Sequence, residues 1–355
     1  MKKAEAARQR EQLKEQQRKV DFDTYDITVE DLVRRVSKKK IEISPAYQRQ
    51  FRWGHDRQSR LVESILLGIP VPPLFMATNV KEDSGRTWEV VDGLQRLLSL
   101  TNFLGDDQAR DVARLEDEPL RLKDMEFLNS IEGLAANDLP ADIREGLEDK
   151  PVKVIILNDK SDERVRFDLF ERLNTGGIQL TDQEIREAVF AGDFIDLLTE
   201  LSETHLFKTT VKMQKKRLKD GTPQDFVLRF FAFKESYSNF DHSVKDFLNE
   251  FCASASQDVD MAQRRQSFID TFTFLAKVFP KGIYRGKRSI TPVNMYEGIV
   301  VGASLALDEK PNLVVPEDLS WIESKEFHDF TTGATNSRKQ VAGRIEYARD
   351  RFLGR

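Results

Sequence analysis

The segment Trp88–Leu104, WEVVDGLQRLLSLTNFL, decides the fold of the first half of the chain. Its first four residues include a tryptophan and two valines, which favour a strand, and Leu94–Leu104 is apolar enough to form a buried helix. Between them, Asp92-Gly93 predicts a tight turn, because glycine readily adopts a positive φ. A strand that turns directly into a helix predicts a domain of mixed α and β structure.

The segments around this core carry similar signals. Thr28 can cap a helix that runs to about Val36, and Gly68 can end a second helix. Alternating or β-branched residues predict three further strands. The predicted helices are 29–36 and 57–67, and the predicted strands are 41–43, 74–77 and 152–157.

The second half of the chain has a different composition. Of the 24 phenylalanines, 13 lie between Phe194 and Phe279, and no convincing strand follows Gly192. Thr181 and Glu184 form a capping box, which predicts a helix start. We therefore expect an α+β lobe with a small mixed sheet, followed by an all-α helical lobe. The expected divisions are a charged tail or helix at 1–19, the α+β domain at 20–192 and the helical domain at 193–355.

Composition limits the classes of function. The 355 residues include 55 Lys and Arg against 60 Asp and Glu, for a net charge of −5, which argues against a uniformly basic DNA-coating protein but allows a local basic groove. Cys252 is the single cysteine and excludes an intrachain disulfide or a cysteine-rich zinc site. No apolar run reaches membrane-helix length and no secretory signal is evident, so we expect a cytoplasmic protein without a membrane partner.

Asp92-Gly93-Leu94-Gln95-Arg96 is the most pointed candidate for chemistry. Free N–H groups at a helix start favour an anion, and Arg96 adds a planar cation suited to phosphate. Asp92 can hold Mg²⁺, usually through water, beside those phosphates. The competing interpretation is an ordinary Asp-Gly turn with a surface arginine, and taken alone the five residues favour that turn.

Two other loops are candidate phosphate sites. Gln48, Arg49 and Arg52 lie among aromatic residues, a combination that can grip phosphate and stack on a base. A loop whose aromatics only cover the edge of the core explains them equally well. Asn174 begins an Asn-Thr-Gly-Gly sequence whose glycines allow an anion-binding nest, although Gly-Gly is also a common turn between helices.

Two basic stretches are candidate nucleic-acid surfaces. The first contains Lys212, Lys215, Lys216 and Arg217, flanked by Lys208 and Lys219, and the second contains Lys281, Arg285, Lys287 and Arg288. Either can contact DNA phosphates or serve as a solvated face. We favour DNA for the first stretch and leave the second open.

Familiar hydrolytic machinery is missing from the sequence. The four histidines are widely spaced, and no paired-histidine helix, Gly-x-Ser-x-Gly elbow or Walker-type phosphate loop occurs. A nuclease that acts by itself is therefore the least favoured function.

Taken together, several ordered motifs resemble the N-terminal domain of GmrSD-type restriction endonucleases. They are ISPAYQR at 43–49, ESILLGIPVPP at 63–73, VDGLQR at 91–96 and FERLNTGG at 170–177, and the resemblance covers roughly residues 25–240. It implies a ParB/sulfiredoxin-like nucleotide-binding fold with a helical extension. It also implies a bacterial anti-phage defence protein that uses a nucleoside triphosphate (ATP, GTP or CTP) with Mg²⁺ and senses modified phage or other foreign DNA.

The resemblance also implies roles for individual residues. The family signature is Asp-Gly-Gln-Gln-Arg, so Asp92, Gln95 and Arg96 correspond to catalytic positions and Asp92 to the metal position. Gly93, Gln48, Arg49 and Asn174 become phosphate-binding candidates. Leu94 replaces the first glutamine of the signature, so nucleotide binding can persist while hydrolysis weakens.

Many relatives carry a C-terminal HNH nuclease, for which residues 241–355 lack the histidine cluster. The chain is thus expected to resemble the stand-alone, GmrS-like form, and cleavage of DNA would need a separate nuclease subunit. Two hypotheses remain: an NTPase switch that senses DNA, and a non-hydrolysing DNA- or nucleotide-binding adaptor. Assembly into a homo-oligomer is left open.

Overall fold

The computed structural model describes residues 2–17, 21–43, 53–81, 85–115, 117–158, 167, 172, 181–190, 192–257, 260–285, 289–333 and 335–355. It divides into two compact units, Met1–Gln179 and Leu180–Arg355. The division precedes the boundary expected at residue 192, because helix α9 (Asp182–Val189) packs against α12 (Thr222–Ser236) and α13 (Val244–Ala255) of the second unit.

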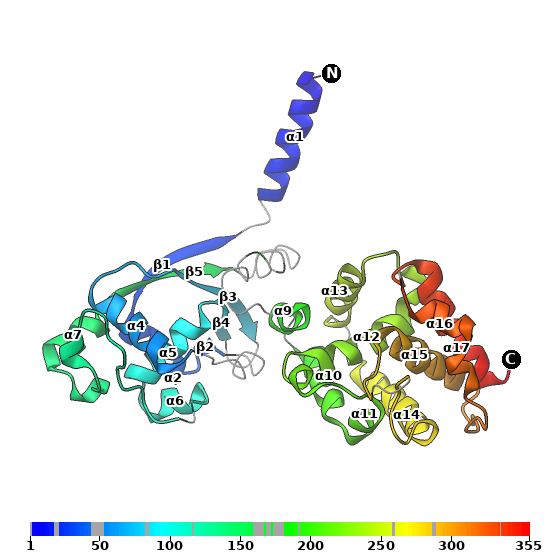
Figure 1. The fold of residues 1–355 in the computed structure, drawn as a ribbon. Coiled ribbons are helices and arrows are strands. Elements are labelled where there is room, and N and C mark those ends of the chain that lie inside the picture. Colours follow the sequence, from blue (N-terminus) through cyan, green and yellow to red (C-terminus); the bar gives the residue numbers. More distant parts are fainter. Residues whose placement is uncertain are drawn as a thin grey trace. The chain divides into compact units, whose positions relative to one another are not determined.

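A five-stranded mixed sheet organises the N-terminal unit (Figure 1). The strand order is β1-β5-β3-β4-β2, in which β1/β5 and β3/β4 pair antiparallel and β3/β5 and β2/β4 pair parallel. The strands are β1 (Phe22–Thr28), β2 (Ile41–Glu42), β3 (Leu74–Lys81), β4 (Gly85–Asp92) and β5 (Pro151–Leu157). This confirms the predicted α+β class with a small mixed sheet.

Three helices pack on one face of this sheet. They are α2 (Val29–Ser37), α4 (His55–Leu66) and α5 (Leu94–Leu104), and their apolar faces form one core with Leu74, Met76 and Val154 of the strands. The predicted caps are confirmed at α2, where the Thr28 hydroxyl accepts from the Asp31 N–H at 3.3 Å. Burial of these faces, at roughly 25 cal/mol per Å², is the main stabilising contribution in this unit.

The sequence interpretation missed strand β1. Five of its seven residues are exposed, including Phe22 and Tyr25, so it lacks the alternation of a half-buried strand. Backbone pairing with β5 along its whole length holds it at the edge of the sheet. Strand identity here comes from a partner about 130 residues away, which local pattern cannot reveal.

The Glu63 carboxylate of α4 binds the stretch between α5 and β5 through hydrogen bonds. Short helices occupy it: α6 (Asp107–Val112), η1 (Asn129–Ile131), η2 (Ala136–Asp138) and α7 (Ala141–Glu148). The Glu63 side chain accepts backbone N–H bonds from Phe127 and Leu128 at 2.8 Å each and from Glu126 at 3.2 Å. A buried carboxylate thus satisfies three loop donors that would otherwise lack partners.

In the described residues of the second unit, all the regular secondary structure is helical (Figure 1). Besides α9, α12 and α13 it contains α10 (Asp193–Glu203), α11 (His205–Thr210), η3 (Lys215–Leu218), η4 (Tyr237–Asn239), α14 (Met261–Val278), α15 (Val293–Glu309), η5 (Ser320–Glu323), α16 (Lys325–Thr331) and α17 (Arg338–Leu353). Its core contains stacked and edge-on phenylalanines, such as Phe268 and Phe272 with ring centroids 4.1 Å apart. The helix-start box is also confirmed, because Thr181 and Glu184 bond each other's backbone N–H groups. None of the described helices has the length and apolar character required to cross a bilayer.

Helices α15 and α17 approach each other closely through glycine. A Cβ added to Gly302 would lie 2.8 Å from the Ala348 Cβ and 2.9 Å from the Ile345 carbonyl oxygen. A Cβ added to Gly298, one turn earlier, would lie 2.9 Å from the Arg344 carbonyl oxygen. Both distances are shorter than carbon side chains tolerate, so the contact depends on these two glycines.

Candidate functional site

A β-bulge at the end of β4 sets the orientation of the Asp92–Arg96 motif. Phe75 of β3 pairs with Asp92, whereas the next residue, Met76, pairs with Val90, so Val91 has no partner on β3. Bulges of this kind bend a strand and re-aim the side chain that follows. Asp92 is consequently the last strand residue, and α5 begins two residues later at Leu94.

Gly93 makes the turn from β4 into α5. Its φ of 94° lies in the left-handed region that glycine adopts readily. A Cβ here would lie 2.4 Å from Leu74 Cδ2 and 2.8 Å from Arg96 Nη2. The missing side chain therefore lets the Arg96 guanidinium fold back over the turn, in addition to permitting the backbone conformation.

Asp92 and Arg96 form an ion pair across this turn. Arg96 Nη2 donates to Asp92 Oδ2 at 2.8 Å and to the Pro73 carbonyl oxygen at 3.1 Å. The Arg96 side chain is 15% exposed and that of Asp92 is 41% exposed, so the carboxylate faces solvent more than the guanidinium does. Arg96 Nε is buried without a hydrogen-bond partner in the described part of the chain.

Among the described residues, no side chain caps the N-terminus of α5. The first N–H groups of a helix have no partner within it and carry the positive end of the helix dipole. Here they lie beside the Arg96 guanidinium, at the bulged end of β4. The turn therefore combines an exposed carboxylate, a cation and uncapped N–H donors within five residues.

The side-chain amide of Gln95 contacts the backbone at Trp53, just before α4. Its Oε1 accepts from the backbone N–H of Trp53 at 3.1 Å, while Gln58 Nε2 of α4 donates to the Trp53 carbonyl oxygen at 2.9 Å. Buried hydrogen bonds continue from Gln58 to Asn102 and from Asn102 to Arg110. The backbone of Trp53 is therefore held at both its N–H and its carbonyl group, and Gln95 helps to position the start of α4.

Several predicted residues lie outside the described residues. Gln48, Arg49, Arg52 and Asn174 are among them, so their proposed phosphate and DNA contacts stay predictions. Of the two basic stretches, Lys212, Lys215, Lys216 and Arg217 are described and belong to the second unit. Arg285 is also described, but its guanidinium turns inward to the Thr331 hydroxyl and the Ile322 carbonyl oxygen.

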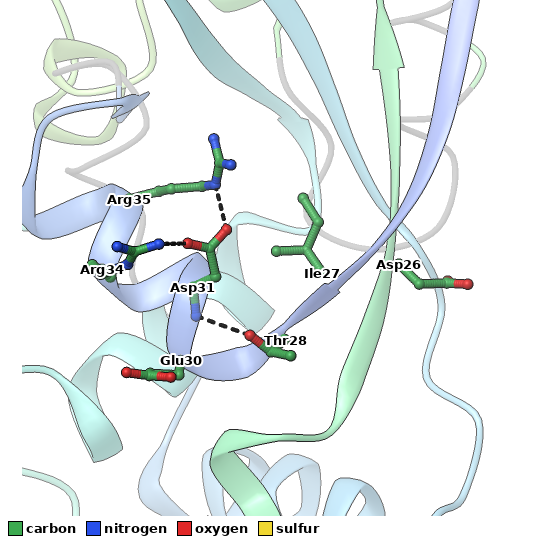
Figure 2. A pocket seen from close by; sticks show the side chains of 7 residues that line it. All are labelled: Asp26, Ile27, Thr28, Glu30, Asp31, Arg34 and Arg35. Atoms are coloured by element: carbon green, nitrogen blue, oxygen red, sulfur yellow. Dashed lines mark hydrogen bonds and ion pairs between the residues drawn. The ribbon is translucent and has the colours of Figure 1, made fainter.

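An open depression of about 610 Å³ at the junction of β1 and α2 is a separate candidate (Figure 2). Asp31 lies at its centre and receives hydrogen bonds from both Arg34 and Arg35. Burial favours the neutral acid, but the two arginines outweigh it and hold the pKa of Asp31 below its ordinary value. Because these charges satisfy one another, the depression offers a ligand no clear excess of either sign.

Sequence reasoning also missed a buried chain of charges in the second unit. It runs from Arg186 of α9 through Asp225 and Arg229 of α12 to Glu297 of α15 and Arg344 of α17. Burial alone would raise the pKa of Asp225, yet Arg229 and Arg186 hold it below its ordinary value. Except for Asp225 and Arg229, which are four residues apart on α12, these residues lie far apart in the sequence, so no local pattern predicts their contacts.

We next consider which side chains could hold a metal ion. Among the described residues, no group of three or more His, Cys, Asp or Glu side chains is arranged to hold a metal ion. At the turn itself, Asp92 is the residue that offers a carboxylate.

A comparison with known families matches the part of the chain that contains this turn. Residues 29–191 match the family model of the GmrSD restriction endonuclease, N-terminal domain. The chain carries a GmrSD N-terminal domain. This confirms the resemblance inferred from the motifs, although the match ends well before residue 240. The comparison with curated proteins gave no match.

The match at residues 29–191 indicates a restriction-type defence family. Restriction endonucleases act on DNA, so DNA is the class of partner that the family indicates. The matched segment includes all of β2 to β5 and the turn Asp92–Arg96. The turn is thus part of the GmrSD domain itself.

Proposed function

We propose that the GmrSD domain binds a nucleoside triphosphate (ATP, GTP or CTP) with Mg²⁺ at Asp92–Arg96 and hydrolyses it as a conformational switch. In this proposal the switch reports the presence of modified phage DNA or other foreign DNA to a restriction-type system. The observation that carries it is the Asp92–Arg96 pair at 2.8 Å beside the uncapped start of α5. Carboxylate, cation and free N–H groups are what a Mg²⁺-bound phosphate chain needs.

The donor set suits Mg²⁺ in its usual protein environment. Mg²⁺ prefers one or two carboxylates together with water and substrate phosphates, and the exposed Asp92 carboxylate supplies one. When bound, the ion would neutralise charge on the phosphate oxygens. Arg96 would then exchange Asp92 for a phosphate oxygen, which offers a physical route from nucleotide binding to movement of α5.

A second function, a non-hydrolysing adaptor or specificity subunit for a separate nuclease, is favoured by two side chains. Leu94 is apolar where the family signature has glutamine, and the Gln95 carbonyl oxygen is engaged by Trp53. Neither side chain therefore offers a free amide oxygen to orient an attacking water. Binding at the turn survives this change more readily than hydrolysis does.

The experiment combines calorimetry with phosphate release by the purified full chain. We expect Mg²⁺-dependent binding of at least one triphosphate, weakened at least tenfold by Asp92→Ala and by Arg96→Ala. Lys153→Gln, which removes an exposed lysine elsewhere in the same unit, should leave binding unchanged. Equal binding by wild type and both turn variants contradicts the proposed site.

A gain-of-function variant separates the two functions. Leu94→Gln restores the family signature, so an adaptor with weakened chemistry should gain phosphate release while its nucleotide affinity changes little. Robust release by the wild-type chain, lost in Asp92→Ala, supports the NTPase switch instead.

A further inference from the structure

The two basic stretches of the second unit are joined by backbone hydrogen bonds. The Ile283 N–H donates to the Thr210 carbonyl oxygen at 2.8 Å, and the Thr291 N–H donates to the Lys212 carbonyl oxygen at 2.9 Å. The Lys212 N–H in turn donates to the Thr291 hydroxyl at 2.8 Å. Segments about 70 residues apart in the sequence therefore run side by side directly after α11.

Gly282 brings lysines of the two segments together. Its φ of 96° is left-handed, and a Cβ at this position would lie 2.7 Å from Lys212 Cε and 3.1 Å from the Thr209 carbonyl oxygen. The second segment therefore crosses directly over the Lys212 stem. Lys281 immediately precedes Gly282, so its backbone is one residue from the contact with the Lys212 side chain.

Positive charge gathers here without acidic neighbours in the sequence. Residues 206–219 contain six cations and residues 277–292 contain five, and neither segment contains an aspartate or glutamate. Lys208 forms an ion pair with Glu203, and the Arg285 guanidinium turns inward. Among the described residues, no carboxylate forms an ion pair with any other described cation of these two segments. We call the set Lys212, Lys215, Lys216, Arg217, Lys219 and Lys281 the basic platform; all of its members are exposed except the half-buried Lys212.

We propose that the basic platform binds the phosphate backbone of duplex DNA, with both segments contacting one duplex. The inference deepens the proposed function, since it rests on the chain sensing DNA, but it does not depend on the turn at Asp92. An uncompensated cluster of cations repels itself, and phosphates relieve that repulsion with release of counterions. The chain as a whole has a net charge of −5, so this local excess marks a particular face.

Duplex DNA suits the platform better than a single strand. Proteins that bind single strands stack bases on exposed aromatic rings. In the two segments Phe207 and Phe279 are buried, and Tyr284 is at most partly exposed. Lysines without stacking partners contact phosphates regardless of sequence, so the platform supplies affinity and positioning while base recognition lies elsewhere.

The test is fluorescence anisotropy of the full chain with a labelled duplex over a series of salt concentrations, without nucleotide. Loss of one phosphate contact reduces the slope of log K against log salt by about one. We expect a reduction of about two for Lys215→Gln/Lys216→Gln and of about one for Lys281→Gln. Lys38→Gln/Lys40→Gln, which removes two exposed lysines of the first unit, is the matched control and should leave the slope unchanged.

Several outcomes would overturn the inference. An unchanged slope in the platform variants, or an equal change in the control pair, excludes this location. An effect of Lys215 and Lys216 without any effect of Lys281 excludes the joined surface. Tighter binding of single strands or of anionic lipid vesicles than of duplex excludes the proposed partner.

The Asp92→Ala variant keeps this test independent of the nucleotide site. It should bind duplex as wild type does if the platform is correct, whether or not it binds nucleotide. Thermal unfolding of each variant checks that a loss of binding is not a loss of folding.

Discussion

The backbone N–H of Trp53 donates a 3.1 Å hydrogen bond to Gln95 Oε1, which ties the start of α4 to the first turn of α5. Gln58 holds the next peptide unit by donating to the Trp53 carbonyl oxygen. The fourth residue of the family signature therefore positions backbone around the turn. Its hydrogen bond contributes about 1 kcal/mol to the free energy of unfolding.

Two substitutions distinguish positioning by Gln95 from direct phosphate contact. Gln95→Ala removes the acceptor, so the chain should lose about 1 kcal/mol of stability in urea unfolding. Gln95→Glu keeps an acceptor oxygen and should restore that stability, yet its added negative charge beside Asp92 should weaken triphosphate binding. If stability is the same in all three proteins, the Trp53 contact has no energetic role.

Gly93→Ala should destabilise the N-terminal unit by about 2–4 kcal/mol, because strain at positive φ adds to a contact with Leu74. Gly133→Ala is the matched control, since its φ of 82° carries the same strain but no atom lies within 4 Å of the added Cβ. Chemical denaturation of both variants isolates the cost of the contact. Equal losses would show that Leu74 and Arg96 move aside freely.

The contact of α15 with α17 predicts opposite effects for two helical glycines. Gly302→Ala places a Cβ 2.8 Å from Ala348 and should cost about 1–3 kcal/mol of unfolding free energy. Gly146→Ala, in α7, meets no atom within 4 Å and should stabilise its helix by about 0.5–1 kcal/mol. Calorimetric unfolding of the two variants measures both signs, and destabilisation by Gly146→Ala would refute the packing argument.

Glu63 predicts a loss of stability in acid. Burial would raise the pKa of this carboxyl, but hydrogen bonds from Phe127, Leu128 and Glu126 hold it below the ordinary value. Because the folded-state pKa is the lower one, the contribution is complete above about pH 4.3, the ordinary glutamate pKa, and is lost as the pH falls through the folded pKa.

Glu63→Gln is the variant that tests this dependence. An amide keeps one acceptor but cannot titrate, so its stability should be lower than wild type at neutral pH and should converge with wild type in acid. Denaturant midpoints over a pH series measure the difference. A constant gap between the two proteins at all pH values would assign the acid sensitivity to other groups.

The sequence predicted correctly those helices whose start or apolar run is visible within a few neighbouring residues. The α5 span agrees with its apolar run, and Thr28 and Thr181 cap the helices that they were expected to cap. Strand β1 was missed because its residues are exposed and its strand structure comes from pairing with β5. The bulge at Val91 was equally invisible, since register depends on the partner strand.

In the candidate site, too, features set by neighbouring residues could be predicted and features set by distant contacts could not. The motif Asp92–Arg96 could be found from sequence because its parts lie within five residues. The engagement of Gln95 by Trp53, and the joining of Lys212 to the segment after α14, depend on contacts over long sequence separations. Such contacts follow from tertiary packing, which single-sequence patterns do not encode.

The buried charges from Arg186 to Arg344 make the two ends of the helical unit interdependent. Glu297 holds Arg229 on one side and Arg344 on the other, and both Glu297 and Arg344 are almost fully shielded from water. Removing α17 would take away one of the two arginines that neutralise Glu297, and removing α9 would take away one of the two that neutralise Asp225. A helical fragment that lacks either α9 or α17 is therefore expected to be less stable than the whole unit.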